Sequence, residues 1–110
     1  MTYEEVSKVL FNVGFNSGIR NLRKLEFEGG RFCVGFSDKE NITEIYLSVA
    51  VKNSSESLYA VIIKETDPKE LESKIDRVIN LLKPQIIAFN EEMKQKLDTL
   101  KEFHKIESWS

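Results

Sequence analysis

The C-terminal segment from Asp67 to about Lys105 constrains the fold most, because its pattern is that of one very long amphipathic helix. Asp67 is a good N-cap, Pro68 suits the first helical position, and Glu70 completes a capping box. No helix-ending signal of similar quality follows until about Lys105. Such a helix would measure roughly 57 Å at 1.5 Å per residue, which exceeds a domain of this size.

Pro84 lies in the middle of this segment, where proline removes a backbone donor and clashes with the preceding turn. The apolar positions nevertheless keep a spacing of about 3.6 residues across it. They are Leu71, Ile75, Val78, Leu82, Ile86, Phe89, Met93, Leu97 and Leu100. Two separate helices would have no reason to stay in register. We therefore predict one long Pro-kinked helix, with a helical hairpin broken near Lys83 as the alternative.

The second half of this helix is expected to extend beyond its own domain, so its apolar side would need another partner. An apolar seam on a protruding helix favours coiled-coil pairing, most simply as a homodimer. The predicted dimer or partner interface consists of Ile86, Phe89, Met93, Leu97, Leu100 and Phe103. The alternative is a two-helix layer folded over one sheet face, which would give a compact monomer.

Residues 1–66 are predicted to form a short helix followed by an antiparallel sheet. Thr2 and Glu5 form a capping-box pattern before a helix from about Tyr3 to Val13, and residues 16–21 are predicted to be a turn. Alternating apolar residues then predict four strands, within residues 23–28, 31–37, 42–51 and 58–66. Gly29-Gly30 separates the first two strands, which is typical of a hairpin.

The short links between these strands predict a four-stranded antiparallel meander, since parallel strands need longer crossovers. The predicted fold is therefore a single α+β domain over residues 1–110. Residues 1–66 would supply the helix and sheet, and residues 67–107 a C-terminal helical region that dimerises.

Both faces of the last two predicted strands carry apolar residues. One row of apolar side chains consists of Ile45, Leu47, Val49 and Val51, joined by Leu58, Ala60 and Ile62. The remaining apolar side chains are Tyr46, Ala50, Tyr59, Val61 and Ile63. A sheet open to water on one side should alternate more cleanly, so we expect a helix or a second subunit to cover part of the second face. An uncovered apolar patch there would itself indicate a binding site.

The composition limits the choice of function and compartment. The chain has 110 residues and a net charge of −2, and this near-balance argues against a dedicated polyanion binder. Cys33 is the single cysteine, so no internal disulfide can form, and we expect Cys33 to be structural. The apolar runs are shorter than a membrane span, and the first residues are unlike a signal peptide. We expect a cytoplasmic protein.

Catalytic and metal-binding patterns are weak in this sequence. His104 is the only histidine and is remote from Cys33 along the chain, which does not favour a thiol paired with an imidazole base. One cysteine and one histidine cannot make a structural zinc site. Gly29-Gly30 lies between strands and lacks the helix that follows a phosphate-binding loop. We therefore predict a non-enzymatic protein and expect no metal or cofactor.

Single-stranded nucleic-acid binding is the alternative function, because basic groups interleaved with aromatic rings on a sheet can track a strand and stack its bases. The basic candidates are Arg20, Arg23, Lys24 and Arg31, and the aromatic candidates are Tyr46 and Tyr59. Phe27, Phe32 and Phe36 alternate as core residues do, so we leave them out of this set.

Three resemblances at the level of fold or segment add a further alternative. A meander followed by one kinked helix resembles the single-strand-binding domain of the transcriptional coactivator PC4, which dimerises through its helices. The stretch "LYAVIIKETDPKELESKIDRVINLL" is similar to the final strand and helix of Pcc1, a small dimerising subunit of the KEOPS tRNA-modification complex. It covers under a quarter of the chain, and Glu72 stands where that family has arginine. A helix before a meander also resembles type III secretion chaperones. These likenesses imply a small dimerising subunit of a larger complex.

Overall fold

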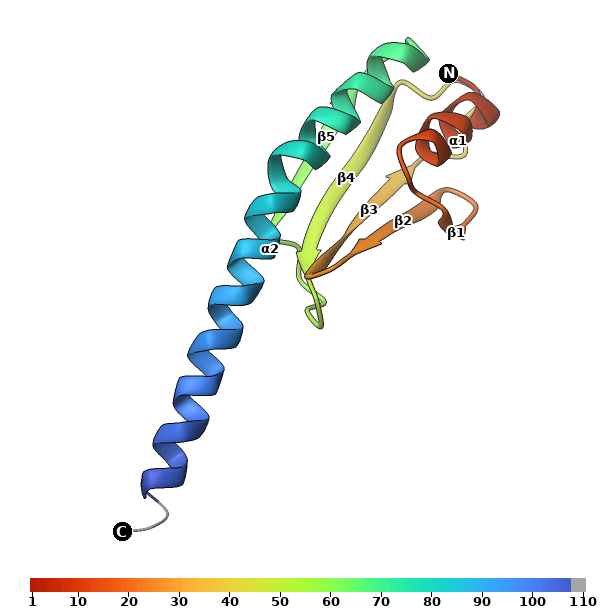
Figure 1. The fold of residues 1–110 in the computed structure, drawn as a ribbon. Coiled ribbons are helices and arrows are strands. Elements are labelled where there is room, and N and C mark those ends of the chain that lie inside the picture. Colours follow the sequence, from red (N-terminus) through yellow and green to blue (C-terminus); the bar gives the residue numbers. More distant parts are fainter. Residues whose placement is uncertain (108–110) are drawn as a thin grey trace.

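The structure is a computed structural model that describes residues 1–107, with side chains for residues 1–96 (Figure 1). Its elements are α1 (Tyr3–Asn12), β1 (Ser17–Ile19), β2 (Leu22–Phe27), β3 (Gly30–Phe36), β4 (Glu44–Val51), β5 (Tyr59–Lys64) and α2 (Pro68–Glu107). The strands form one antiparallel sheet in the order β1-β2-β3-β4-β5. Both helices pack into one core with the same sheet face, which gives the predicted α+β class in two layers.

The sheet has five strands, so the prediction of four was wrong. The additional strand is β1, which lies within the segment predicted as a turn. Ser17 pairs with Lys24 and Ile19 pairs with Leu22, on either side of a two-residue turn. Gly18 has a φ of 124°, and a Cβ there would collide with the backbone of β2. A strand of three residues is too short to produce a recognisable alternating pattern, and its glycine is typical of turns.

The prediction of one long C-terminal helix is confirmed, since α2 runs through Pro84 without a break. Pro84 cannot donate to the carbonyl group of Asn80. Both residues are exposed, so water can hydrogen-bond to that carbonyl in place of the missing backbone donor. The hairpin alternative is therefore wrong, because the helix loses one internal hydrogen bond only on its solvent side.

The core lies between the helices and one face of the sheet. It contains Val6, Val9, Leu10 and Phe15 from the N-terminal part, Phe32, Val34, Phe36, Ile45, Leu47, Val49 and Ile63 from the sheet, and Leu71, Ile75, Ile79 and Ile86 from α2. On β5 the helix-covered residues are Tyr59, Val61 and Ile63, which pair with Val49, Leu47 and Ile45. The predicted faces of β5 were thus exchanged, since a shift of one residue in pairing turns every side chain over.

Glu65 holds the junction between β5 and α2. One carboxylate oxygen lies 2.8 Å from Nζ of Lys74. The other accepts hydrogen bonds from the backbone N–H groups of Thr66 and Asp67, at 2.9 and 3.2 Å. The Lys74 hydrogen bond, followed by these backbone hydrogen bonds, lowers the pKa of the Glu65 carboxyl to about 2. An ionised carboxylate after β5 therefore binds both the two residues that precede α2 and Lys74 in the second turn of the helix.

We expect Glu65→Gln to reduce thermal stability near neutral pH and to lose this effect in acid. The carboxyl has a lower pKa in the folded chain than its unfolded value of about 4.3. Its contribution is therefore complete above about pH 5 and disappears as the pH falls towards 2. Thermal unfolding of the parent chain and the variant across this range measures the difference. Glu56→Gln removes the same charge from an exposed loop, and an equal effect there would contradict the role of Glu65.

Gly30 is the point at which α2 crosses the start of β3. A Cβ at Gly30 would lie 2.5 Å from the carbonyl oxygen of Ala50 and 3.0 Å from Cγ2 of Ile86. Ile86 is buried in the core. Gly35 on the same strand is different, because a Cβ there would meet only the flexible Leu22 side chain, at 3.4 Å. Glycine at position 30 therefore allows β3 to pack closely against both the β4 backbone and α2.

Gly30→Ala should destabilise the fold by about 1–3 kcal/mol, because the added methyl group would displace backbone or α2. Gly35→Ala, the matched control on the same strand, should change the free energy of unfolding by less than about 0.5 kcal/mol. Denaturant unfolding of both variants gives the comparison. Equal losses would contradict the close contact between β3 and α2.

Candidate functional site

The sheet face opposite the helices, which we call the open face, carries an apolar row across all five strands. The pairing register places Ile19, Leu22, Gly35, Tyr46 and Ile62 side by side in this row. The large side chains are well exposed, with Ile19 at 79%, Leu22 at 66%, Ile62 at 54% and Tyr46 at 49%. Exposed apolar side chains that gather in this way are typical of an interaction surface.

Small side chains occupy the middle of the open face. The row next to the apolar one contains Ser17, Lys24, Cys33, Ser48 and Ala60. Cys33 and Ser48 lie on the two central strands, beside Gly35 of the first row. The centre of the open face is therefore low, and the larger Leu22, Tyr46 and Ile62 stand around it.

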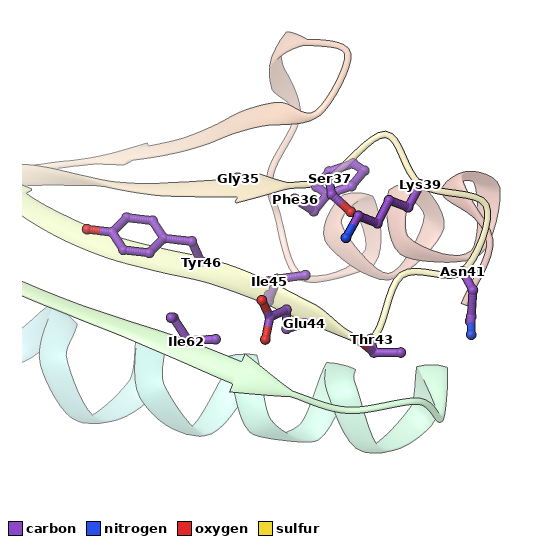
Figure 2. Close-up of a pocket in the computed structure, with 10 residues that line it drawn as sticks. All are labelled: Gly35, Phe36, Ser37, Lys39, Asn41, Thr43, Glu44, Ile45, Tyr46 and Ile62. Carbon is purple, nitrogen blue, oxygen red and sulfur yellow. The ribbon is translucent and has the colours of Figure 1, made fainter.

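A hollow of about 340 Å³ lies at the end of the open face next to the β3–β4 loop. Figure 2 shows Tyr46 and Glu44 on β4 and Ile62 on β5, with Lys39 contributed by the loop. An apolar floor with one cation and one anion at its edge suits an amphipathic side chain from a partner. Within residues 1–96, no three His, Cys, Asp or Glu side chains lie together in a way that could hold a metal ion.

The second uncovered surface is the tail, which we define as residues 91–107 of α2. Asn90 of α2 lies beside the β2–β3 turn, with its Cβ 3.5 Å from the position of a Cβ on Gly29, and Glu91, Lys94 and Gln95 still line a hollow together with Glu28 of that turn. Beyond this point the helix extends past the ends of the strands (Figure 1). Phe89, just before the tail, and Met93, within it, are 41% and 42% exposed.

The predicted interface residues divide into three groups. Ile86 is buried in the core of its own chain and is not available to a partner. Phe89 and Met93 are exposed, as a partner interface requires. Leu97, Leu100 and Phe103 lie in the helical part of the chain, but their side chains are outside the described residues.

The predicted nucleic-acid residues do not gather on one face. Lys24, Arg31 and Tyr46 lie on the open face, whereas Arg23 and Tyr59 pair with Val34 and Val49 of the helix-covered face. Arg20 lies in the turn between β1 and β2. Ile19 and Leu22 were missed by the sequence analysis, and the signal that could have found them is their position on either side of a two-residue turn.

Arg23 holds α1 against β2. Its guanidinium group donates hydrogen bonds to the hydroxyl groups of Tyr3 and Ser7, at 2.9 and 3.0 Å, and to the carbonyl of Arg20 at 2.6 Å. It also lies over the Tyr3 ring, 5.8 Å from its centre. These contacts engage the donors of Arg23 within its own chain, so its position favours a structural role over a contact with phosphate.

Arg23→Gln should therefore lower the free energy of unfolding by about 1–2 kcal/mol, since two hydrogen bonds to α1 and one to the carbonyl of Arg20 are lost. Lys24→Gln removes the same charge from the neighbouring position on the open face and should change it by less than about 0.5 kcal/mol. Denaturant unfolding distinguishes the two. A neutral Arg23→Gln variant would contradict the structural role.

No helix in the described part of the chain is long and apolar enough to cross a membrane. In comparisons with known proteins, no family model, no curated protein and no solved structure matches this chain.

Proposed function

We propose that this chain is a non-enzymatic homodimeric interaction module and that the tail of α2 makes the principal contact. One observation carries this proposal: α2 leaves its own sheet with its apolar stripe still in phase. Phe89 and Met93 follow the buried Ile86 by three and seven positions, which places all three on the same side of an α-helix. The stripe therefore continues where its own chain has no sheet to cover it.

The extent of the tail supports a partner. The molecule measures 66 Å along its longest axis, against 23 and 20 Å across. Most helical stability in proteins comes from packing of an apolar side rather than from intrinsic propensity. A helix that continues to Glu107 beyond its own sheet would fray in water unless another surface covered its apolar side.

A second copy is the partner that the charges favour most. The exposed residues at the start of the tail carry both signs, with Glu91 and Glu92 followed by Lys94 and Lys96, and the whole chain is almost neutral. A mixed surface of this kind suits self-association and offers little attraction to a polyanion. The nucleic-acid alternative is weakened because Glu26 is the cross-strand neighbour of Arg31 on the open face, Arg31 donates to the carbonyl of Ser54, and Arg23 donates to Ser7 of α1.

Light scattering after size exclusion tests the proposal, and we expect the mass of a dimer at micromolar concentration. Met93→Glu should raise the dissociation constant at least tenfold, because it would bury a charge in the contact. Ala88→Glu adds the same charge to an exposed position of α2 outside the stripe and should leave the dimer intact. A chain shortened after Asn90 should be a folded monomer. A parent chain that stays monomeric at these concentrations would contradict the proposal.

A further inference from the structure

The open face and the start of the tail, where Met93 is the one apolar side chain among residues 91–96, both leave apolar side chains exposed. We infer that they cover one another between two copies, so that each tail lies on the open face of the partner chain. This inference rests on the homodimer proposed above and names the surface that receives the tail. The occupant of the open face is therefore a second copy of this chain.

The direction of the apolar stripe supports this arrangement. Leu71, Ile75 and Ile86 are buried against the sheet, so the stripe of α2 faces the plane of its own sheet. Phe89 and Met93 continue the stripe and face the same plane beyond the strand ends. Consider a second sheet that lies in the same plane, end to end with the first. If this second sheet is turned over, its open face lies on the same side as α2 of the first chain and contacts Phe89 and Met93.

The same operation makes the contact reciprocal. A two-fold axis perpendicular to α2, in the plane of the sheet, turns the second chain over and directs its tail back along the open face of the first. Each chain then gives a tail and receives one, which is an isologous and closed contact. The arrangement needs no change in fold, because the tail already extends past the strand ends (Figure 1).

The dimensions of the two surfaces match. The tail measures about 25 Å at 1.5 Å per residue. The longest strand of the open face, β4, has eight residues and spans about 27 Å. Five strands at about 4.8 Å spacing give a width of roughly 20 Å, which accommodates one helix about 10 Å in diameter.

The area of the reciprocal contact approaches that of a specific interface. One tail on one face has a flat footprint of about 250 Å² on each side, so two such contacts involve about 1,000 Å² before side-chain relief is counted. Specific protein interfaces bury roughly 1,200–2,000 Å² in total. A dimer formed by the two tails alone would offer about half of this footprint.

The relief of the open face suits an apolar helix. Its centre is lined by the small residues Cys33, Gly35 and Ser48, and the larger Tyr46 and Ile62 stand beside them. Large side chains on a helix, such as Met93, can occupy the low centre while the larger residues of the sheet flank the helix. The low centre and the long apolar side chains are thus supplied by different parts of the same chain.

Charged residues near the β2–β3 turn are compatible with a partner tail that runs along the open face from this turn. The partner tail would enter beside the β2–β3 turn, where Arg31 and Lys52 line a shallow hollow that also includes Glu26. The first residues of the tail are Glu91 and Glu92. Arg31 donates a hydrogen bond to the carbonyl of Ser54, and Glu92 lies 3.5 Å from Nζ of Lys96 in its own chain, so Lys52 and Glu91 are the opposite charges that this placement brings together.

Pairing between the tails is the competing arrangement. A parallel pair joined along the stripe is blocked, since the sheet already covers that side of α2 as far as the β2–β3 turn. An antiparallel pair of tails is sterically allowed. It would leave Ile19, Leu22, Tyr46 and Ile62 exposed on both copies, so it accounts for only one of the two uncovered surfaces.

Cys33, the single cysteine of the chain, offers a direct test because it lies on the open face. Met93→Cys adds a thiol to the stripe of the tail, and a short bis-maleimide then reports whether the two positions meet. Within one chain the sheet separates α2 from Cys33, so a link between them has to join two chains. We expect efficient formation of a covalent dimer by Met93→Cys and little by the parent chain.

Two matched variants define the result. Cys33→Ser combined with Met93→Cys should abolish the covalent dimer, and Ala88→Cys, on the exposed side of α2, should not form it. A covalent dimer that persists without Cys33 would indicate pairing between the tails and would overturn the inference while leaving the homodimer in place. A dimeric mass with no covalent product would also overturn it, and a monomeric mass would overturn both proposals.

Replacement of Ile62 gives an independent measurement. Ile62 is half exposed on the open face, so Ile62→Ser should leave the fold intact, which thermal unfolding can verify. We expect the dissociation constant of the dimer to rise at least tenfold, because the tail loses an apolar contact at each of two equivalent sites. An unchanged dissociation constant in a folded variant would overturn the placement of the tail on the open face.

Discussion

The contact between Ile86 of α2 and Gly30 of β3 is the interaction on which the rest of the structure depends. It fixes the point at which the helix crosses the end of the sheet, because the backbone of β3 allows the isoleucine side chain to approach only where no Cβ is present. One helical turn later the stripe has no sheet of its own to cover. The same contact therefore completes the core and determines where the uncovered part of the stripe begins.

Pro84 acts together with this contact. A proline in place of the buried Ile79 would leave the carbonyl group of Ile75 unpaired among apolar residues, whereas at position 84 it leaves only the carbonyl of Asn80, which is exposed to water. The helix can therefore pass through the proline without changing the phase of its stripe. If the helix broke at Pro84, Met93 would no longer lie on the same side of α2 as the buried residues. The apolar side of the tail would then no longer face the plane of the sheet.

The elements that could be predicted from sequence are those with long periodic patterns. The spacing from Leu71 to Met93 identified one helix across Pro84, and the alternation from Phe32 to Phe36 identified a core strand. The five-strand sheet could not be predicted, because β1 has only three residues and contains Gly18. The faces of β5 were exchanged because both carry apolar residues, so the pattern alone did not decide between them. Their orientation depends on the pairing after the β4–β5 loop, where the backbone N–H of Leu58 donates to the carbonyl of Val49.

That exchange of faces changes the interpretation of the candidate site. With Tyr59 on the helix-covered face, the open face retains Tyr46 and gains Ile62, Ile19 and Leu22, so its row is more aliphatic than the sequence had indicated. An aliphatic row with a low centre fits a helix better than it fits stacked bases, which require exposed rings. The tail and the open face also lie on one chain, so a one-way contact, in which each tail occupies the face of the next copy, leaves one tail and one face free at the ends unless the copies close into a ring. Such an open contact would continue to add copies, whereas the two-fold exchange closes with two.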